Sequence, residues 1–463
     1  MARRKYLNAP VGGCTVRMYR VGLGDCFLLA FRANKQRRKY VLIDCGVLLG
    51  SNDATNTMRS VVKDIRQVTG GHLSALVVTH EHWDHVSGFL QAEEEFKKIT
   101  VDQVWLAWTE NPSNPLAHEL RERRRIALQG LHDALADAGD KTPFFTQRIQ
   151  SLTDFYGLEF GVAGRMTTEK AFDFVKQQWG TPRYLKPGQR PLIIEGLPDV
   201  RFFVLGPPED ASYIRKSRPS SHGGQVYLDD PNTGELGLYL SALGRKDNNI
   251  RREKYTPFNA AYHVDTPEDT VLNNQPLERL RSKYNWETWR QINMDWAGAA
   301  GELALRLDAH TNNTSLVLAV ELAPNNKVLL FPGDAQVGNW LSWDSVKWTG
   351  EYHELTAKEL LSRTVLYKVG HHGSHNATLR EKGLERMTNE DLAAMIPVDR
   401  QVAKKRRWRM PHEPLYERLN EMTLGRIILT DSGLPEHYGN KIVKDFRNNF
   451  HENQLFFDYS IEQ

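Results

Sequence analysis

The segment LVVTHEHWDHVSG, residues 76–88, places three histidines, a glutamate and an aspartate in six positions directly after an apolar run. Four of these side chains, His80, His82, Asp84 and His85, follow the pattern H-x-H-x-D-H. Two histidines that are one residue apart on extended backbone leave the chain on the same side, so both imidazoles can bind one cation. Asp84 and His85 come next, where the chain turns, and can serve a neighbouring cation. The spacing therefore predicts a metal site at this loop.

Other apolar runs also end in a side chain suited to a metal site. Asp44 ends the run YVLID, Asp334 ends KVLLFPGD, and His371 follows TVLYKVG. Open α/β sheets place their chemistry at the carboxyl ends of strands, so we expect these residues to share one edge with the histidine loop. Asp44 is placed to orient the histidines from behind by hydrogen bonding. Asp25, in LGDC, either orients a ligand or caps a turn.

The bulk composition is that of an ordinary folded protein, with 40% hydrophobic and 25% charged residues. A net charge of +3 is small for 463 residues and says little about partners. The sequence shows no apolar stretch of the length of a signal peptide or membrane span, so we expect a cytoplasmic protein without membrane contact. Three cysteines in no CxxC spacing predict buried thiols rather than disulfides or a thiolate metal site.

Apolar periodicity predicts an α/β protein in which strands and helices alternate near both ends of the chain. Residues 1–105 form a first αβ half and residues 306–463 a second. Residues 106–198 and 209–305 are more polar, and their clearest elements have helical spacing. We interpret them as two largely helical insertions in one enlarged domain spanning residues 1–463, where a partner protein could bind. The oligomeric state stays open.

These motifs together resemble the metallo-β-lactamase fold superfamily, in which HEHWDH, IDCG, FPGDA and VGHHGS have counterparts in the same order. The chain is also similar to the hydrolase domain of the competence protein ComEC/Rec2. The further matching segments are RVGLGD (20–25), VLGPP (204–208), NNTSLVL (312–318), PHEPLYERL (411–419) and TDSG (430–433). The resemblance implies an αββα sandwich, with two mixed sheets face to face, helices outside and metals at one edge.

The resemblance also implies a set of ligands for two divalent ions. His80 and His82 would bind the first, Asp84, His85 and His371 the second, and Asp334 would bridge both. Many relatives add a histidine before the strand that resembles NxxSLVL, and the candidate for this role is His310, with Asn312 or Asn313 as the alternatives.

A pair of divalent ions would lower the pKa of a shared water and generate a hydroxide that attacks a phosphorus or carbonyl centre. Imidazole and carboxylate ligands suit zinc, manganese or iron, and the resemblance favours zinc or manganese. Asp84 is expected to act in catalysis as well as in binding. His412 is the other catalytic candidate, because a cationic histidine would stabilise a leaving oxygen. His372, Ser374 and His375 are placed beside His371 to contact substrate oxygens.

The basic run KKRRWR leads directly into the segment that carries His412. Cationic side chains beside an aromatic ring suit a phosphate backbone with stackable bases, so a substrate-binding role is predicted for Lys404, Lys405, Arg406, Arg407 and Trp408. We therefore expect a phosphodiesterase or nuclease that acts on DNA, another nucleic acid or a nucleotide. The alternatives are a hydrolase of a small molecule, such as a lactone, thioester or cyclic nucleotide, and a non-catalytic relict that binds nucleic acid.

Overall fold

The computed structural model describes residues 6–32, 38–138, 154–156, 168–217, 278–279, 282–283, 305–323, 325–434 and 446–462. The chain divides into two compact units, one made of Met1–Arg121, Asp154–Leu228 and Ala309–Gln463, the other of Glu122–Thr153 and Asp229–Asp308. Most of the second unit lies outside the described residues. The features below belong to the first unit.

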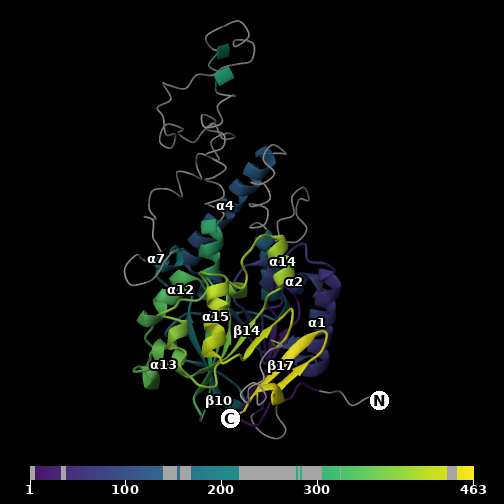
Figure 1. Ribbon diagram of the computed structural model, residues 1–463, viewed down its shortest axis with the longest axis vertical. Helices are drawn as coiled ribbons and strands as arrows, with labels where there is room; N and C mark the ends of the chain where they lie inside the picture. Colours follow the sequence, from purple (N-terminus) through teal and green to yellow (C-terminus); the bar gives the residue numbers. More distant parts are fainter. Residues whose placement is uncertain are drawn as a thin grey trace. The chain divides into compact units, whose positions relative to one another are not determined.

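Two mixed sheets form the centre of the first unit (Figure 1). The eight-stranded sheet consists, in spatial order, of β16 (Phe450–Glu452), β17 (Phe456–Ile461), β1 (Cys14–Tyr19), β2 (Phe27–Arg32), β3 (Arg38–Ile43), β5 (Ala75–Val78), β7 (Val104–Ala107) and β8 (Arg183–Leu185). The seven-stranded sheet consists of β15 (Ile427–Leu429), β14 (Ala393–Ile396), β13 (Thr364–Lys368), β12 (Lys327–Phe331), β11 (Val317–Leu322), β10 (Leu197–Gly206) and β9 (Leu192–Ile194). A small separate sheet pairs β4 (His72–Leu73) with β6 (Thr100–Val101).

The two large sheets bury their facing sides against each other. Phe27 of β2 meets Phe331 of β12 with ring centroids 5.8 Å apart, and Phe202 of β10 contacts both Phe31 and Trp105 edge to face. These aromatic side chains belong to one continuous cluster of buried residues drawn from both sheets. Burial on this scale removes apolar surface from water and holds the two sheets together.

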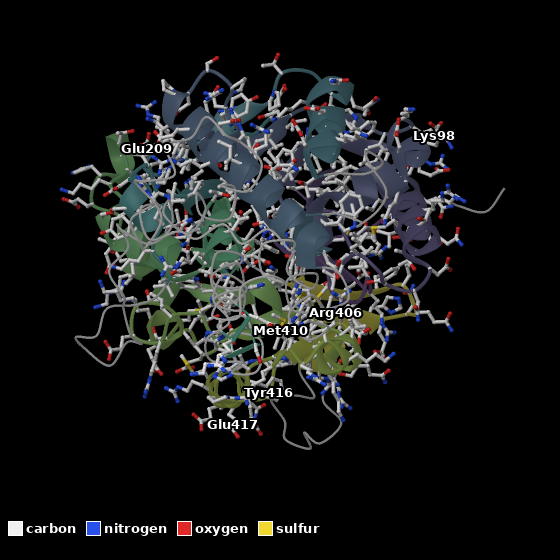
Figure 2. The ribbon with its side chains drawn as sticks, turned by 90° about the horizontal axis from the view of Figure 1, so that it is seen from above. Lys98, Glu209, Arg406, Met410, Tyr416 and Glu417 are labelled. Carbon is white, nitrogen blue, oxygen red and sulfur yellow. The ribbon has the colours of Figure 1, made fainter. Side chains whose placement is uncertain are left out.

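Helices cover the outer faces of the sandwich. In α1 (Ala54–Thr69), buried residues at positions 58, 61, 62, 65 and 68 form one apolar face, which packs on the eight-stranded sheet together with α2 (Trp83–Gln91) and α6 (Thr168–Gln178). On the other side, α12 (Val337–Ser342) and α13 (Ala357–Ser362) contact β10 and β12. The remaining helices are α3 (Glu93–Phe96), α4 (Pro115–Ala138), α7 (Ala211–Ile214), α14 (Arg400–Lys405) and α15 (Glu413–Met422). Polar residues such as Lys98 and Glu209 point outward (Figure 2).

This layering confirms the predicted αββα sandwich. The stretch 106–198 contains α4 and α6, but it also supplies β8 and β9 to the two sheets. The predicted insertion 209–305 lies almost entirely outside the described residues. Among the helices that the structure describes, none is both long and apolar enough to cross a bilayer. Cys14, Cys26 and Cys45 are buried and free, as expected.

Several strands present their carboxyl ends at the same edge. The strands β3, β5 and β7 run parallel to one another, and so do β12, β13 and β14. Short buried runs such as ALVV in β5 suit strands covered on both faces. The loops that follow these strands carry the residues of the candidate site.

Gly46 allows the loop after β3 to lie directly against the histidine motif. A Cβ atom at this position would come within 2.4 Å of the carbonyl carbon and oxygen of Asp84 and 2.5 Å of the His85 nitrogen. The same segments are joined by backbone hydrogen bonds, since Cys45 N donates to His85 O and Asp25 N donates to Asp84 O, both at 2.9 Å. The close approach therefore requires glycine.

We predict that Gly46→Ala destabilises the protein by roughly 1 to 3 kcal/mol, because the new methyl group overpacks against rigid backbone. Urea unfolding followed by circular dichroism measures the change. Thr55→Ala, at an exposed position of α1, is the control and should stay within about 0.5 kcal/mol of the parent protein. A Gly46→Ala protein as stable as the control would contradict this packing.

Candidate metal centre

The histidine motif occupies the junction between β5 and α2. His80 follows the strand, His82 is the N-cap residue of α2, and Asp84 and His85 lie in the first turn of that helix. His80 Nε2 lies 3.1 Å from His82 Nδ1, so the two imidazoles direct nitrogens toward one point. The Asp84 carboxylate also gains from its place near the positive end of the helix dipole. All four side chains are buried.

Asp44, at the end of β3, holds the motif from behind. Its carboxylate accepts hydrogen bonds from the Thr79 N–H at 2.8 Å and the Thr79 hydroxyl at 2.7 Å. Asp44 Oδ2 also lies 2.8 Å from His85 Nδ1. The proton on that ring nitrogen is thus directed to Asp44, and His85 presents Nε2 to the site. The predicted orienting role of Asp44 agrees with this geometry.

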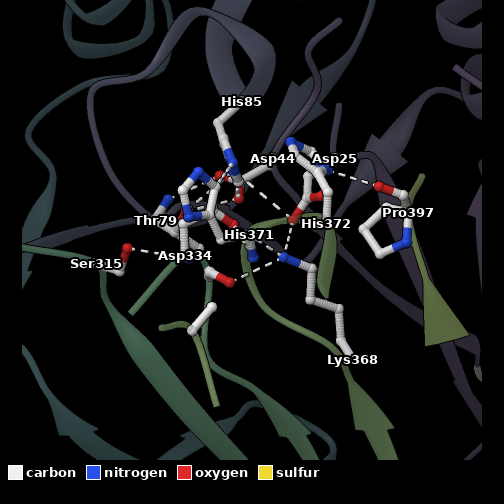
Figure 3. Close-up of polar contacts among 12 residues, drawn as sticks. Asp25, Asp44, Thr79, His85, Ser315, Asp334, Lys368, His371, His372 and Pro397 are labelled. Atoms are coloured by element: carbon white, nitrogen blue, oxygen red, sulfur yellow. Dashed lines mark hydrogen bonds and ion pairs between the residues drawn. The ribbon is translucent and has the colours of Figure 1, made fainter. Parts of the chain in front are cut away.

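Asp334 follows β12, and its two carboxylate oxygens have different partners. Oδ1 accepts the His371 N–H at 2.8 Å and lies 3.3 Å from Lys368 Nζ. Oδ2 faces the opposite way and lies 3.1 Å from His85 Nε2 (Figure 3). One oxygen is therefore held by the protein, while the other points into the group of imidazoles.

His371 and His372 are separated by the turn after β13. His372 Nε2 lies 2.8 Å from Asp84 Oδ2, and its Nδ1 lies 2.6 Å from the carbonyl oxygen of Pro397. His371 instead places its Nδ1 3.1 Å from Gln336 Nε2 and 3.0 Å from Ser374 Oγ. The structure thus brings the ring of His372, predicted to contact substrate, to Asp84, and places the ring of His371 against Gln336 and Ser374, while the His371 N–H contacts Asp334. The motif spacing does not distinguish these neighbours, and a ligand role for His371 stays a prediction.

Lys368 is a member of the site that the sequence analysis missed. Its ammonium group donates to Gly333 O at 2.9 Å and forms ion pairs with Asp25 and Asp334 (Figure 3). Asp25 therefore meets Lys368 directly, while its Oδ2 lies 3.8 Å from His85 Nδ1. A lysine inside the apolar run TVLYKVG was the signal, since a buried ammonium requires a partner.

The donor atoms of this cluster lie close enough together to hold cations. In each of three groups, the potential ligand atoms lie within 4.8 Å of one another, and the groups are His80 with His85 and Asp334, Asp84 with Asp334 and His372, and Asp25 with Asp44 and His85. Several donor atoms of this cluster are buried without a hydrogen bond within the described residues, among them Asp25 Oδ1, Asp84 Oδ1, His85 Nε2 and Asp334 Oδ2. Buried polar atoms are normally paired, so a divalent cation fits this donor set.

The charges of the buried side chains also favour the binding of a cation. Burial lowers the pKa of His82 to about 3 and that of His371 to about 4, so these rings are neutral near pH 7. Burial acts on His85 in the same direction, but Asp334, Asp25 and the other nearby carboxylates outweigh it and hold the pKa of His85 well above its ordinary value. Four buried carboxylates outnumber the three groups here that can carry positive charge, which are the Lys368 ammonium and the rings of His85 and His372, whose pKa values the carboxylates raise against the effect of burial.

Phe155 and Tyr156 form an aromatic wall over the motif, which the sequence analysis also missed. They belong to a short 3-10 turn (Asp154–Tyr156), and their rings lie 5.6 Å and 4.9 Å from that of His82. Phe155 also lies 6.1 Å from His371 and stacks on Trp408 at 5.3 Å. Both rings are buried. No local signal marks these residues, because their position depends on contacts between distant segments.

His310 and its two alternatives occupy different surroundings. His310 Nε2 lies 3.0 Å from Arg215 O. The Asn313 amide donates to Ile214 O and Lys216 O, and its oxygen accepts from the Asn339 N–H. Asn313 is therefore engaged in structural hydrogen bonds, and Asn312 is fully buried beside it. A ligand role for His310 or Asn312 stays a prediction.

The remaining predicted residues surround the cluster. The backbone N–H of His412 donates to Gly373 O at 2.8 Å, and its ring lies 6.0 Å from that of His375. Arg406 donates to Leu49 O at 2.9 Å and pairs with Asp154, so it holds the turn that carries the aromatic wall. Lys404, Lys405 and Arg407 are exposed.

Part of the chain is similar to a known protein family. Residues 19–150 match the model of the metallo-beta-lactamase superfamily, a range that includes Asp25, Asp44 and the histidine motif. A search of curated proteins gave no match. The matched segment and the two mixed sheets between helices agree with the αββα sandwich of the metallo-beta-lactamase fold.

Proposed function

We propose that the protein is a hydrolase that uses two divalent ions, zinc or manganese, to cleave phosphodiester bonds in nucleic acid. The proposal is carried by one observation, the convergence of buried imidazoles and carboxylates beside a basic, tryptophan-bearing pocket. The ligands would be His80, His82 and Asp334 for the first ion, and Asp84, His85, His372 and the shared Asp334 for the second.

Such ions, when bound, lower the pKa of water and polarise a phosphoryl oxygen. The protein's own residues would prepare the site for that chemistry. Asp44 fixes the His85 ring, and Lys368 holds one oxygen of Asp334. Asp84 Oδ1, which makes no hydrogen bond within the described residues, is placed to accept a proton from an attacking water. The aromatic wall would restrict entry of bulk water.

The substrate class is inferred from the pocket beside the site. This pocket, of about 450 Å³, is lined by Arg400, Lys404, Arg407, Trp408, Arg409 and Tyr416 among others. Figure 2 shows Arg406, Met410 and Tyr416 in this C-terminal part of the chain. Trp408, which lines the pocket, stacks on Phe155, and the Phe155 ring lies beside His82. Exposed cations and a partly exposed indole suit a phosphate backbone with bases.

The resemblance to the competence-type hydrolases supports DNA as the polymer, because it rests on motifs distributed along most of the chain. We place the protein in the cytoplasm and assign possible partner binding to the stretch 209–305. Hydrolysis of a lactone, thioester or cyclic nucleotide, and binding of nucleic acid without cleavage, are the outcomes that the experiments below separate from this proposal.

We predict that the purified protein holds stoichiometric transition metal, about two ions per chain. Asp334→Ala should lose most of this metal, since it removes the carboxylate shared by both groups of ligands. Inductively coupled plasma mass spectrometry measures the content. Asp391→Ala, at an exposed acid, is the control and should match the parent. A parent protein without metal, with no difference in Asp334→Ala, would contradict the dinuclear centre.

Incubation with manganese or zinc and a panel of substrates tests the reaction class. The panel contains labelled single-stranded and double-stranded DNA, RNA, a generic phosphodiester and a lactone. We expect cleavage of nucleic acid and of the diester, with the parent faster than Asp334→Ala by more than about 100-fold, since both metal sites are affected. Turnover of the lactone alone would refute the phosphodiesterase assignment. Binding of DNA without cleavage would favour a non-catalytic protein that binds nucleic acid.

The pocket is tested by the double variant Lys404→Glu with Arg409→Glu. We expect DNA cleavage to fall at least about tenfold and to become less sensitive to salt, because two attractive contacts to phosphates become repulsive. Turnover of the small diester should change less than about twofold, since that substrate does not reach the pocket. Lys358→Glu, an exposed lysine on α13, is the matched control. Equal losses on both substrates, or none, would remove the pocket from polymer binding.

A further inference from the structure

We propose that His371 contacts the substrate as a neutral imidazole whose Nε2–H donates a hydrogen bond to a phosphoryl oxygen of the scissile diester, while His372 serves the metal. The identity of the substrate in this inference rests on the proposed function. The different roles of the two histidines are argued separately, from the geometry around each ring.

A chain of hydrogen bonds fixes the tautomer of His371. The Ser374 hydroxyl donates to Asn376 Oδ1 at 2.9 Å, and the Asn376 amide donates to Gln336 Oε1 at 2.8 Å. Gln336 therefore directs its own amide N–H toward His371 Nδ1, 3.1 Å away. With each amide oriented by the one before it, Nδ1 must accept, and the ring proton of a neutral imidazole then sits on Nε2.

Ser374 Oγ also lies 3.0 Å from His371 Nδ1, but its one proton is donated to Asn376, so it is the Gln336 amide that makes Nδ1 an acceptor. The opposite arrangement, with a proton on Nδ1, would set that N–H against the N–H of Gln336. A nitrogen that binds metal must offer a lone pair, and in this network Nε2 of His371 carries a proton instead.

His372 has the opposite arrangement. Its Nδ1 lies 2.6 Å from Pro397 O, which can only accept, so Nδ1 carries a proton. The Nε2 atom of the neutral ring then has a lone pair, and it faces Asp84 at 2.8 Å. A carbonyl behind the ring and a carboxylate ligand in front are the usual surroundings of a histidine that binds metal.

A strained backbone conformation at His371 and His372 directs their two rings to different partners. His371 and His372 are consecutive left-handed residues with φ of 44° and 53°, a conformation that costs a non-glycine residue roughly 1 to 2 kcal/mol. The bond from the His371 N–H to Asp334 Oδ1 and that from the Ser374 N–H to His371 O, at 2.9 Å, hold it in place. Strain retained in this way is typical of functional sites.

The surroundings of His371 suit a donor to a bound anion. Its ring lies 6.1 Å from that of Phe155, which is also within 5.6 Å of the His82 ring, so His371 is on the side of the cluster that carries His82. A preorganised donor in a site that excludes water contributes strongly where negative charge develops on an oxygen. Gln336 is then a positioning residue, because it acts on the substrate only through the ring of His371.

Four zinc-loaded variants test the division of labour: His371→Ala, His371→Gln, His372→Ala and, as a control, His353→Ala at an exposed histidine. We expect His371→Ala to keep the full metal content of the parent and His372→Ala to lose about one ion per chain. The kcat for a generic diester should fall about 100- to 1000-fold in His371→Ala. His371→Gln should retain more activity, since its amide N–H can reach the place of Nε2–H. Loss of metal from His371→Ala like that from His372→Ala would overturn the proposal.

Long-range ¹H–¹⁵N correlation spectra of the zinc-loaded parent give a readout that does not depend on activity. The His371 ring, assigned by comparison with His371→Ala, should show an unprotonated Nδ1 and a protonated Nε2. Gln336→Met, which removes the amide donor, should weaken this preference and lower kcat without loss of metal. A protonated Nδ1 in the parent would overturn the proposal. A parent that cleaves no diester would refute the proposed function, while metal counts and spectra still decide the roles of the two histidines.

Discussion

Asp25, Asp44, Asp84 and Asp334 are all buried at one edge of the sandwich, and burying a carboxylate costs several kcal/mol unless charge and hydrogen bonds compensate it. The surrounding structure supplies that compensation. Thr79 and His85 satisfy Asp44, Lys368 pairs with Asp25 and Asp334, and His372 lies against Asp84. The four acids still outnumber the protein's own cationic groups at this edge, and Asp84 Oδ1, His85 Nε2 and Asp334 Oδ2 are among the atoms of the cluster that are buried without a hydrogen bond. A pair of divalent ions would satisfy both needs at once.

The same contacts give the site its stiffness. Potential ligand side chains are oriented by contacts on the side away from the cluster. Asp44 contacts His85, Pro397 O contacts His372, and Lys368 contacts Asp334. These partners come from the loops after β3 and β14 and from the last residue of β13, so the positions of the donor atoms depend on the packing of both sheets. The methyl group of a Gly46→Ala variant would therefore displace the backbone of Asp84 and His85, and with it their side chains in the site.

Much of the fold was predictable from sequence, because apolar runs such as ALVV and the periodic apolar face of α1 are local signals. The motif loop and the strand-end acids were predictable for the same reason, since each follows such a run. The different surroundings of His371 and His372 were not, because they depend on two left-handed residues and on distant partners, Gln336 and Pro397. Phe155 and the anchoring of Arg406 by Asp154 arise from contacts between remote segments, which periodicity does not encode.

The central claim is that one buried cluster, with ligands from both halves of the chain, holds two cations. Crystallographic anomalous scattering from metal-loaded protein, recorded above and below the absorption edge of the added metal, tests it most directly. The account predicts two peaks inside the cluster, one flanked by His80 and His82 and the other by Asp84, His85 and His372, with Asp334 between them. A cluster without a peak, or a single peak held by Asp25 and Asp44, would contradict it.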